Sequence, residues 1–275
     1  MIIDFHLHVA RYADMLPWTR EWISHAYPPG ELEAYLKATL TTAGLRALLR
    51  DNGLDYAVLL AELNPLSSSV VTNEFVAALC QGEPRLIPFA SINPFLTTDL
   101  VAELDRLVGD LGFRGVKLYP PYQHFYPNDS RLYPLYARVQ TLGLPIMFHT
   151  GSSVFKGVRL KYADPLLLDD VAADFPELKI VMAHSGRGVW YTQAFLLARL
   201  HPNVYMEVSG LPPHKLLDYF PDLERLADKV IFGSDWPEVR DIRRNIEAIR
   251  ALPLRDDTKD KILGLNAARL LGLLE

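Results

Sequence analysis

Two histidines near the amino terminus are spaced as metal ligands often are. His6 and His8 are two residues apart in the apolar run from Ile2 to His8, which predicts a β-strand. Side chains two apart in a strand project from the same face, about 6.6 Å from each other along the strand axis. Either histidine alone would also fit an ordinary core position. The pair favours a site in which both imidazoles bind one divalent cation.

Three further ionisable residues each end an apolar run that predicts a strand: His149, His184 and Asp235. In a barrel of parallel strands, polar side chains at the strands' carboxyl ends face one common opening. Several ionisable groups beside apolar strands are costly to bury unless something pairs with them. Imidazoles and a carboxylate suit zinc and other first-row metals, so a bound metal would remove that cost.

The elements that must position these residues alternate along the chain. Eight short apolar runs predict strands: Ile2 to His8, Tyr56 to Ala61, Leu86 to Ser91, Gly115 to Tyr119, Pro145 to His149, Lys179 to His184, Asn203 to Val208 and Lys229 to Asp235. Helical periodicity predicts eight helices: Glu31 to Asn52, Ser69 to Gln81, Thr98 to Leu111, Leu132 to Leu142, Pro165 to Phe175, Val189 to Leu200, Pro213 to Leu226 and Ile242 to Ala251. This alternation predicts an α/β fold, a single (β/α)₈ TIM barrel over residues 1–275, with a doubly wound open sheet as the alternative.

Two stretches interrupt the pattern and are expected to be irregular loops. Val9 to Gly30 is a long loop after the first strand, and Tyr119 to Arg131 follows the fourth. Both begin at a strand's carboxyl end, the side on which barrel loops shape a substrate pocket. The tail from Asp256 to Leu274 predicts two extra helices on the outside of the barrel.

The composition excludes several classes of protein. The chain has 275 residues, of which 49% are hydrophobic and 22% charged, as in an ordinary globular protein. It carries 28 basic and 33 acidic residues, a net charge of −5, which argues against a nucleic acid partner. The amino terminus has no signal-peptide pattern and no apolar run could span a bilayer, so we expect a cytoplasmic protein with no membrane partner.

Four motifs in this order resemble those of a known superfamily. They are His6-Leu7-His8, Phe148-His149-Thr150-Gly151, Ala183-His184-Ser185-Gly186 and Phe232-Gly233-Ser234-Asp235-Trp236-Pro237. Together they resemble the amidohydrolase superfamily, in particular its amidohydrolase-related branch of metal-dependent hydrolases and decarboxylases, which includes aminocarboxymuconate-semialdehyde decarboxylase. The resemblance implies that His6, His8, His149 and Asp235 hold one metal ion, most simply one zinc per chain. It also implies that His184 acts as an acid or base. Asp235 is a second candidate to accept a proton from metal-activated water.

Lys117 leaves three alternatives open. It lies near the end of the predicted fourth strand, where binuclear members of the superfamily carry a carboxylated lysine that bridges two metals. With His149 and His184, the ligands of such a binuclear site are formally present. Unmodified, Lys117 would be a cation for a substrate carboxylate or a charged partner within the protein. It could also be a solvated surface lysine.

Other residues near the strand ends are candidates for substrate binding. Tyr119 follows the fourth strand, and the cations Arg159, Lys161 and Arg187 follow the fifth and sixth. With Lys117, these cations predict a small, anionic substrate. Glu207, near the end of the seventh strand, would orient a ligand histidine or Lys117, or would be a simple surface residue.

The sequence therefore predicts a metal-dependent enzyme. The favoured reaction is hydrolysis of a small, carboxylated amide, ester or lactone by metal-activated water. The alternative is non-oxidative decarboxylation of a small unsaturated or aromatic acid, and a third hypothesis is an inactive scaffold barrel. A monomer and a homodimer are both compatible with the sequence.

Overall fold

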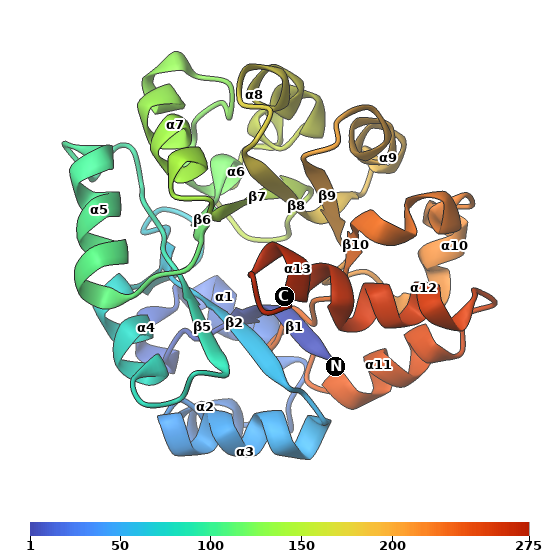
Figure 1. Cartoon of the computed structure of the whole chain (residues 1–275). Coiled ribbons are helices and arrows are strands. Elements are labelled where there is room, and N and C mark those ends of the chain that lie inside the picture. The colour runs from blue at the N-terminus through green and yellow to red at the C-terminus, as the bar shows by residue number, and fades with distance from the viewer. Residues whose placement is uncertain (275) are drawn as a thin grey trace.

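The computed structural model describes residues 1–274, and within them eight parallel strands form one barrel (Figure 1). The first three pair in the order β1-β2-β5, and the other five follow as β6-β7-β8-β9-β10. The strands are β1 (Ile3–His8), β2 (Tyr56–Leu60), β5 (Leu86–Phe89), β6 (Val116–Leu118), β7 (Pro145–Gly151), β8 (Lys179–Arg187), β9 (Val204–Glu207) and β10 (Val230–Ile231). All eight predicted strands are present.

Backbone hydrogen bonds join the two groups of strands at both seams. Between β5 and β6, the amide of Lys117 donates to the carbonyl of Ala90 at 2.7 Å. Between β1 and the segment after β10, the amide of Phe5 donates to Phe232 at 3.1 Å and that of His8 to Trp236 at 2.8 Å. These bonds close the sheet on itself, so the predicted (β/α)₈ barrel is confirmed.

Helices surround the barrel (Figure 1). They are α2 (Leu32–Thr39), α3 (Thr42–Asn52), α4 (Asn73–Cys80), α5 (Leu100–Leu111), α7 (Tyr133–Thr141), α8 (Leu168–Asp174), α9 (Tyr191–Leu200), α10 (Leu216–Tyr219) and α11 (Ile242–Arg250). The predicted helix over 31–52 is in fact two helices, because Leu40 leaves helical geometry and the Thr41 side chain caps α3 by accepting from the amide of Gly44. The predicted helix over 213–226 contains one α-helical turn, α10, between two 3₁₀ segments.

The long loop after β1 contains a helix that the sequence analysis missed. Pro17 begins α1 (Pro17–Ser24), a position that tolerates proline because its missing amide would have no partner there. Thr19 and Ile23, one turn apart, are the buried residues of this helix. The Thr19 hydroxyl donates to the carbonyl of Ser68 at 3.0 Å. Ser68 lies between β3 (Glu62–Leu63) and β4 (Val70–Val71), so α1 rests on this small hairpin.

The loop after β6 also contains a short helix, α6 (Pro120–Gln123), whose four residues are all buried. The predicted irregular stretch over 119–131 is therefore partly helical, and it packs into the protein.

The C-terminal tail closes one end of the barrel instead of lying outside it. It comprises α12 (Asp256–Asp260), a π-helical turn and α13 (Asn266–Leu270). Ala267 and Leu270 pack in one hydrophobic cluster with Ile3, Phe5 and other strand residues of the barrel interior. The predicted extra helices exist, but their expected place was wrong. In Figure 1, α13 lies in front of the strands, near the chain's amino terminus.

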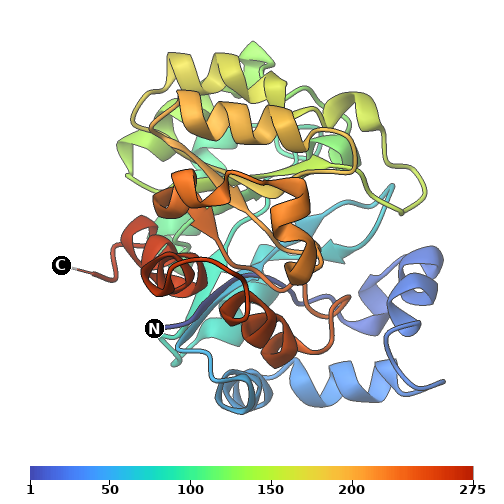
Figure 2. The same ribbon diagram turned by 90° about the vertical axis from the view of Figure 1, so that its right-hand side faces the viewer.

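The two ends of the barrel carry different parts of the chain. Figure 2 shows both termini on one side and the α1 segment on the opposite side.

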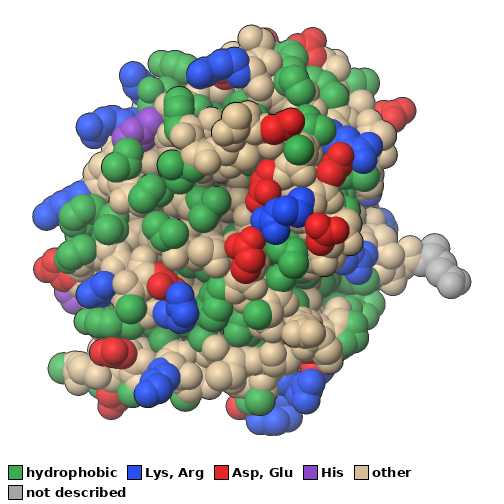
Figure 3. Space-filling view, turned by 90° about the vertical axis from the view of Figure 1, so that its left-hand side faces the viewer, with side chains coloured by type: hydrophobic (Ala, Val, Ile, Leu, Met, Phe, Trp, Pro, Cys, Tyr) green, Lys and Arg blue, Asp and Glu red, His purple; other side chains and the backbone are tan. Residues whose placement is uncertain are grey.

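The outer surface near α4 and α5 carries acidic and basic side chains that alternate (Figure 3). Arg106 on this surface pairs with Glu74 and Glu103 at 2.8 Å each. Among residues 1–274, no helix combines the length and apolar character needed to cross a bilayer.

Candidate metal centre

An irregularity in β1 helps to turn its histidines towards the barrel axis. Asp4 pairs with Ala57 of β2, yet Leu7 pairs with Leu59, so β1 has one extra residue between these positions. Such a bulge shifts the alternation of side chains. Phe5 packs in the core of the barrel interior, and in a regular strand the next residue, His6, would face the opposite side. Here His6 also faces inwards, because it contacts residues of β8 and β9 across the barrel.

Asp4 holds this irregular segment against the neighbouring chain. Its Oδ1 accepts from the amide of His6 at 3.1 Å and from that of Ser234 at 2.9 Å. Asp4 is fully buried, and burial raises its pKa to about 7 although these hydrogen bonds oppose the shift. The two amides belong to a predicted ligand, His6, and to the residue before another, Asp235. Asp4 therefore links two of the three segments that carry the predicted metal ligands.

The side chains of His6, His8 and Asp235 meet at one point. His6 Nε2 lies 3.2 Å from His8 Nε2, and Asp235 Oδ1 lies 3.5 Å from the former and 3.4 Å from the latter. Such a group can hold a metal ion. His149 and His184 lie close by, with ring centroids 4.5 Å apart, and within residues 1–274 the buried His149 Nε2 has no hydrogen-bond partner. The structure thus brings all five predicted residues together.

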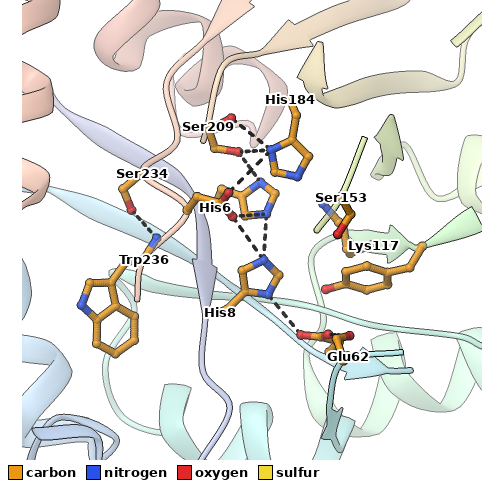
Figure 4. Close-up of polar contacts among 12 residues, drawn as sticks. His6, His8, Glu62, Lys117, Ser153, His184, Ser209, Ser234 and Trp236 are labelled. Atoms are coloured by element: carbon orange, nitrogen blue, oxygen red, sulfur yellow. Dashed lines mark hydrogen bonds and ion pairs between the residues drawn. The ribbon is translucent and has the colours of Figure 1, made fainter. Parts of the chain in front are cut away.

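The outer nitrogens of the first two histidines face carboxylates. His6 Nδ1 lies 3.1 Å from Glu207 Oε2, and His8 Nδ1 lies 3.3 Å from Glu62 Oε2 (Figure 4). If these nitrogens carry the ring protons, both Nε2 lone pairs face each other and the Asp235 carboxylate. Burial lowers the pKa of His8, but the adjacent carboxylates of Asp235 and Glu62 outweigh it and raise the pKa to about 10. The position therefore favours a positive charge, which a divalent cation would supply.

The His184 ring is oriented by the segment after β9. Its Nδ1 lies 3.0 Å from the carbonyl oxygen of Ser209, and since a carbonyl only accepts, Nδ1 carries the proton. The Nε2 atom of the neutral ring is then free to accept a proton. Burial and the nearby Arg187 keep the pKa of His184 well below its usual value. His184 and Asp235 also have left-handed backbones, with φ of 61° and 68°, a strained conformation that clusters at functional sites.

Ser209 and Glu207 connect the histidines. The Ser209 hydroxyl lies 3.0 Å from the Nδ1 atoms of both His6 and His184 (Figure 4). It also lies 2.8 Å from Glu207 Oε2. Glu207 is fully buried and also accepts from the amides of His184 at 3.3 Å and Ser209 at 2.7 Å. It is not a surface residue. It contacts His6, as expected of a group that orients a ligand.

Lys117 lies in the barrel interior and does not line the pocket beside the histidines. It is fully buried, its Nζ donates to the sulfur of Met147 at 3.2 Å, and it lies 5.2 Å from the centre of the Tyr119 ring. Burial lowers the pKa of Lys117, and the carboxylate of Glu207 opposes the shift. These surroundings exclude the alternative that Lys117 is a solvated surface residue.

Arg187 is the cation on the pocket wall. Its Nη1 lies 3.5 Å from Asp235 Oδ2, while Nε and Nη2 donate to the carbonyl of Ser152 at 3.2 and 3.1 Å. Gly210 lies alongside, and a Cβ there would collide with both Arg187 and Asp235. The guanidinium is thus fixed next to the candidate metal ligands.

The other predicted binding residues fall in two groups. Tyr119 lines the pocket, and its hydroxyl donates to the carbonyl of Ala61 at 2.9 Å. Arg159 and Lys161 are exposed and do not line the pocket.

Sequence reasoning missed Ser209, which contacts two of the histidines, and several residues that line the pocket: Glu62, Glu238, and Met15, Thr19 and Ile23 from the α1 region. Glu62 comes directly after a predicted strand, so the signal that identified the histidines could also have found it.

The fold and the cluster together define a TIM-barrel enzyme of the metal-dependent type. A family model described as amidohydrolase matches residues 3–273, and the chain belongs to this family.

Two curated relatives have different activities. A γ-resorcylate decarboxylase from Rhizobium sp. is 25% identical over 251 residues, covering 73% of this chain and 75% of the relative. A 2-keto-4-carboxy-3-hexenedioate hydratase from Sphingobium sp. is 32% identical over 109 residues, covering 34% of this chain and 32% of the relative. Among solved structures, an uncharacterised TIM-barrel protein from Bordetella bronchiseptica has a TM-score of 0.80 and 26% identity, with 98% of each chain covered.

Proposed function

We propose that this protein is a metal-dependent decarboxylase that removes CO₂ from a small aromatic or unsaturated carboxylic acid without oxidation. The observation that carries the proposal is the similarity to γ-resorcylate decarboxylase over 73% of the chain. The pocket supports it, because Arg187 lies beside the candidate metal ligands and fits a substrate carboxylate. We therefore rank decarboxylation above hydrolysis, the reaction that the sequence alone favoured.

The candidate ligands for the metal are His6, His8, His149 and Asp235. The facing Nε2 atoms, the His149 Nε2 that has no hydrogen-bond partner within residues 1–274, and the Asp235 carboxylate form a donor set suited to a divalent first-row ion. One zinc per chain is the simplest expectation. When bound, such an ion supplies positive charge that binds and polarises oxygen atoms of the substrate.

Two pocket residues contribute in distinct ways. Arg187 binds the anionic substrate and orients it. His184, held by Ser209 through Nδ1, accepts a proton at Nε2 from a substrate hydroxyl or from solvent and transfers it to the carbon that bears the carboxylate. The bond between that carbon and the carboxylate then breaks, its electron pair stays on the substrate, and CO₂ leaves.

Addition of water to an unsaturated acid is the second candidate function. It is favoured by the similarity to the hydratase, although that similarity covers 34% of this chain. Hydration and hydrolysis would use the same donor set and would also need His184 to move a proton. The pocket residues alone fit all three reactions, whereas the products differ.

Product analysis tests the proposal. Metal-loaded protein would be incubated in D₂O with hydroxybenzoates, an unsaturated dicarboxylate and an aryl ester, followed by mass spectrometry and CO₂ measurement. A decarboxylase releases CO₂ and leaves one deuterium on the substrate carbon. Products that retain the carboxyl group and gain the elements of water would instead establish hydration or hydrolysis.

A further inference from the structure

Glu238 is an acidic residue of the pocket that the proposed reaction does not use. It follows the cis peptide bond between Trp236 and Pro237, three residues after Asp235. Its partly buried side chain lines the pocket on which His184 and Arg187 also lie.

The carboxyl group of Glu238 has few partners within the described residues. Hydrogen bonding to the Trp22 side chain of α1 is one of the effects that lower its pKa. Within the described residues 1–274, no basic side chain forms an ion pair with Glu238, and Arg187 pairs with Asp235 instead. Burial, reinforced by the charge of Asp235, raises the pKa of Glu238 to about 7, while Arg187 and His8 oppose the shift. A carboxylate offers about four acceptor sites, so Glu238 can accept further hydrogen bonds from a ligand.

Hydroxyl groups on the pocket wall donate elsewhere. The Tyr119 hydroxyl donates to the carbonyl of Ala61 at 2.9 Å, Tyr122 to the Ser153 hydroxyl at 2.7 Å, and Thr19 to the carbonyl of Ser68 at 3.0 Å. These three donors are therefore not available to Glu238. A donor on a bound ligand would satisfy its remaining acceptor sites.

Because of the neighbouring pocket residues, a hydrogen-bond donor on the ligand should strengthen its binding. The pocket wall also includes Ile23, Phe155 and Pro237, which offer no side-chain hydrogen bond. A ligand that fills the pocket displaces water from this carboxylate, so a ligand that supplies a donor in its place avoids the cost of an unpaired acceptor. Above the pKa of Glu238, a second carboxylate at this position would instead meet a like charge.

We propose that Glu238 is a specificity residue, which accepts a hydrogen bond from a hydroxyl or amino group of the substrate and disfavours a second carboxylate. The inference rests on the proposed function in one respect, that the pocket binds an anionic carboxylic acid beside Arg187. It narrows the substrate class to monocarboxylic acids that carry a hydrogen-bond donor away from the reacting carboxylate.

Calorimetric binding to the metal-loaded protein tests this assignment without needing turnover. The ligands are benzoate, its monohydroxy and monoamino isomers, and isophthalate. Glu238→Leu removes the acceptor, and Glu238→Gln keeps a neutral acceptor without the charge. Glu247→Gln is the matched control, because it removes one negative charge from an exposed position on α11 outside the pocket.

We expect at least one donor-bearing isomer to bind the wild type about tenfold or more tightly than benzoate, a typical effect of a hydrogen bond to a charged group. Glu238→Leu should abolish this preference, Glu238→Gln should keep part of it and bind isophthalate more tightly, and Glu247→Gln should match the wild type.

Two results would overturn the role of Glu238: benzoate binding with no preference for any isomer, or a preference that survives in Glu238→Leu. If no carboxylate bound at all, the premise of an anionic substrate would fail as well, which separates the two failures.

Discussion

Replacement of Asp4 probes how the barrel positions its metal ligands. Asp4 Oδ1 accepts from the amides of His6, at 3.1 Å, and Ser234, at 2.9 Å. Asp4→Leu keeps a similar volume and leaves both buried amides without this acceptor. An unsatisfied buried donor costs about 1–3 kcal/mol, so the free energy of unfolding should fall by about 2–6 kcal/mol. At roughly 2 °C per kcal/mol for a chain of this size, the melting temperature should fall by about 4–12 °C.

The same substitution should weaken metal binding, because both amides adjoin candidate ligands. Loss of a group that orients a metal ligand typically costs about tenfold to hundredfold in affinity. Competition with a chromogenic chelator measures that affinity, and a thermal melt of the metal-free protein measures stability separately. Asp4→Asn is the matched control: its side-chain carbonyl can still accept from both amides, so it should lose less on both scales. Wild-type metal affinity in a folded Asp4→Leu variant would refute the positioning role.

Four other substitutions test the remaining assignments and one surface interaction. His8→Ala should lose metal and turnover together. His184→Ala should keep its metal, measured by elemental analysis, and lose about 10²- to 10⁴-fold in turnover. Equal metal loss in both variants would make His184 a ligand. Arg187→Met should raise KM for an acidic substrate and leave KM for its neutral amide unchanged, and an equal effect on both would exclude carboxylate recognition. Hydrogen bonding from Arg85 lowers the pKa of Glu83 to about 2, so the Glu83 interaction stabilises the fold above pH 4.5 and is lost as the pH falls towards 2. Glu83→Gln should therefore lower the melting temperature much more at pH 7 than at pH 2, and an equal loss at both would contradict this linkage.

The strands were predictable because each is a short apolar run bounded by residues that break it. The same regularity placed His149 and His184 at the active end of the barrel, since parallel strands share one carboxyl edge. The α1 helix was not predictable, because its eight residues lie in a proline-flanked stretch and its contacts with Ser67 and Ser68 come from a distant part of the chain.

Two features of the site depend on tertiary contacts that a sequence does not display. The irregularity in β1 involves its pairing with β2 and the hydrogen bonds of Asp4, so nothing local to His6 signals it. Lys117 was expected near a strand's end, which is where it lies, but spacing could not distinguish the barrel interior from the pocket wall. The reaction was the least predictable feature, because hydrolysis, hydration and decarboxylation use the same residue types.

We propose above that a metal at His6, His8, His149 and Asp235 supports loss of CO₂. The most direct test of this proposal measures CO₂ release from a hydroxybenzoate by protein as purified, after chelation, and after stepwise return of a divalent metal. We predict that chelation abolishes CO₂ release and that about one ion per chain restores it, as a single complete donor set requires. Undiminished CO₂ release by metal-free protein, or turnover of the acid to a product that retains its carboxyl group, would contradict the claim.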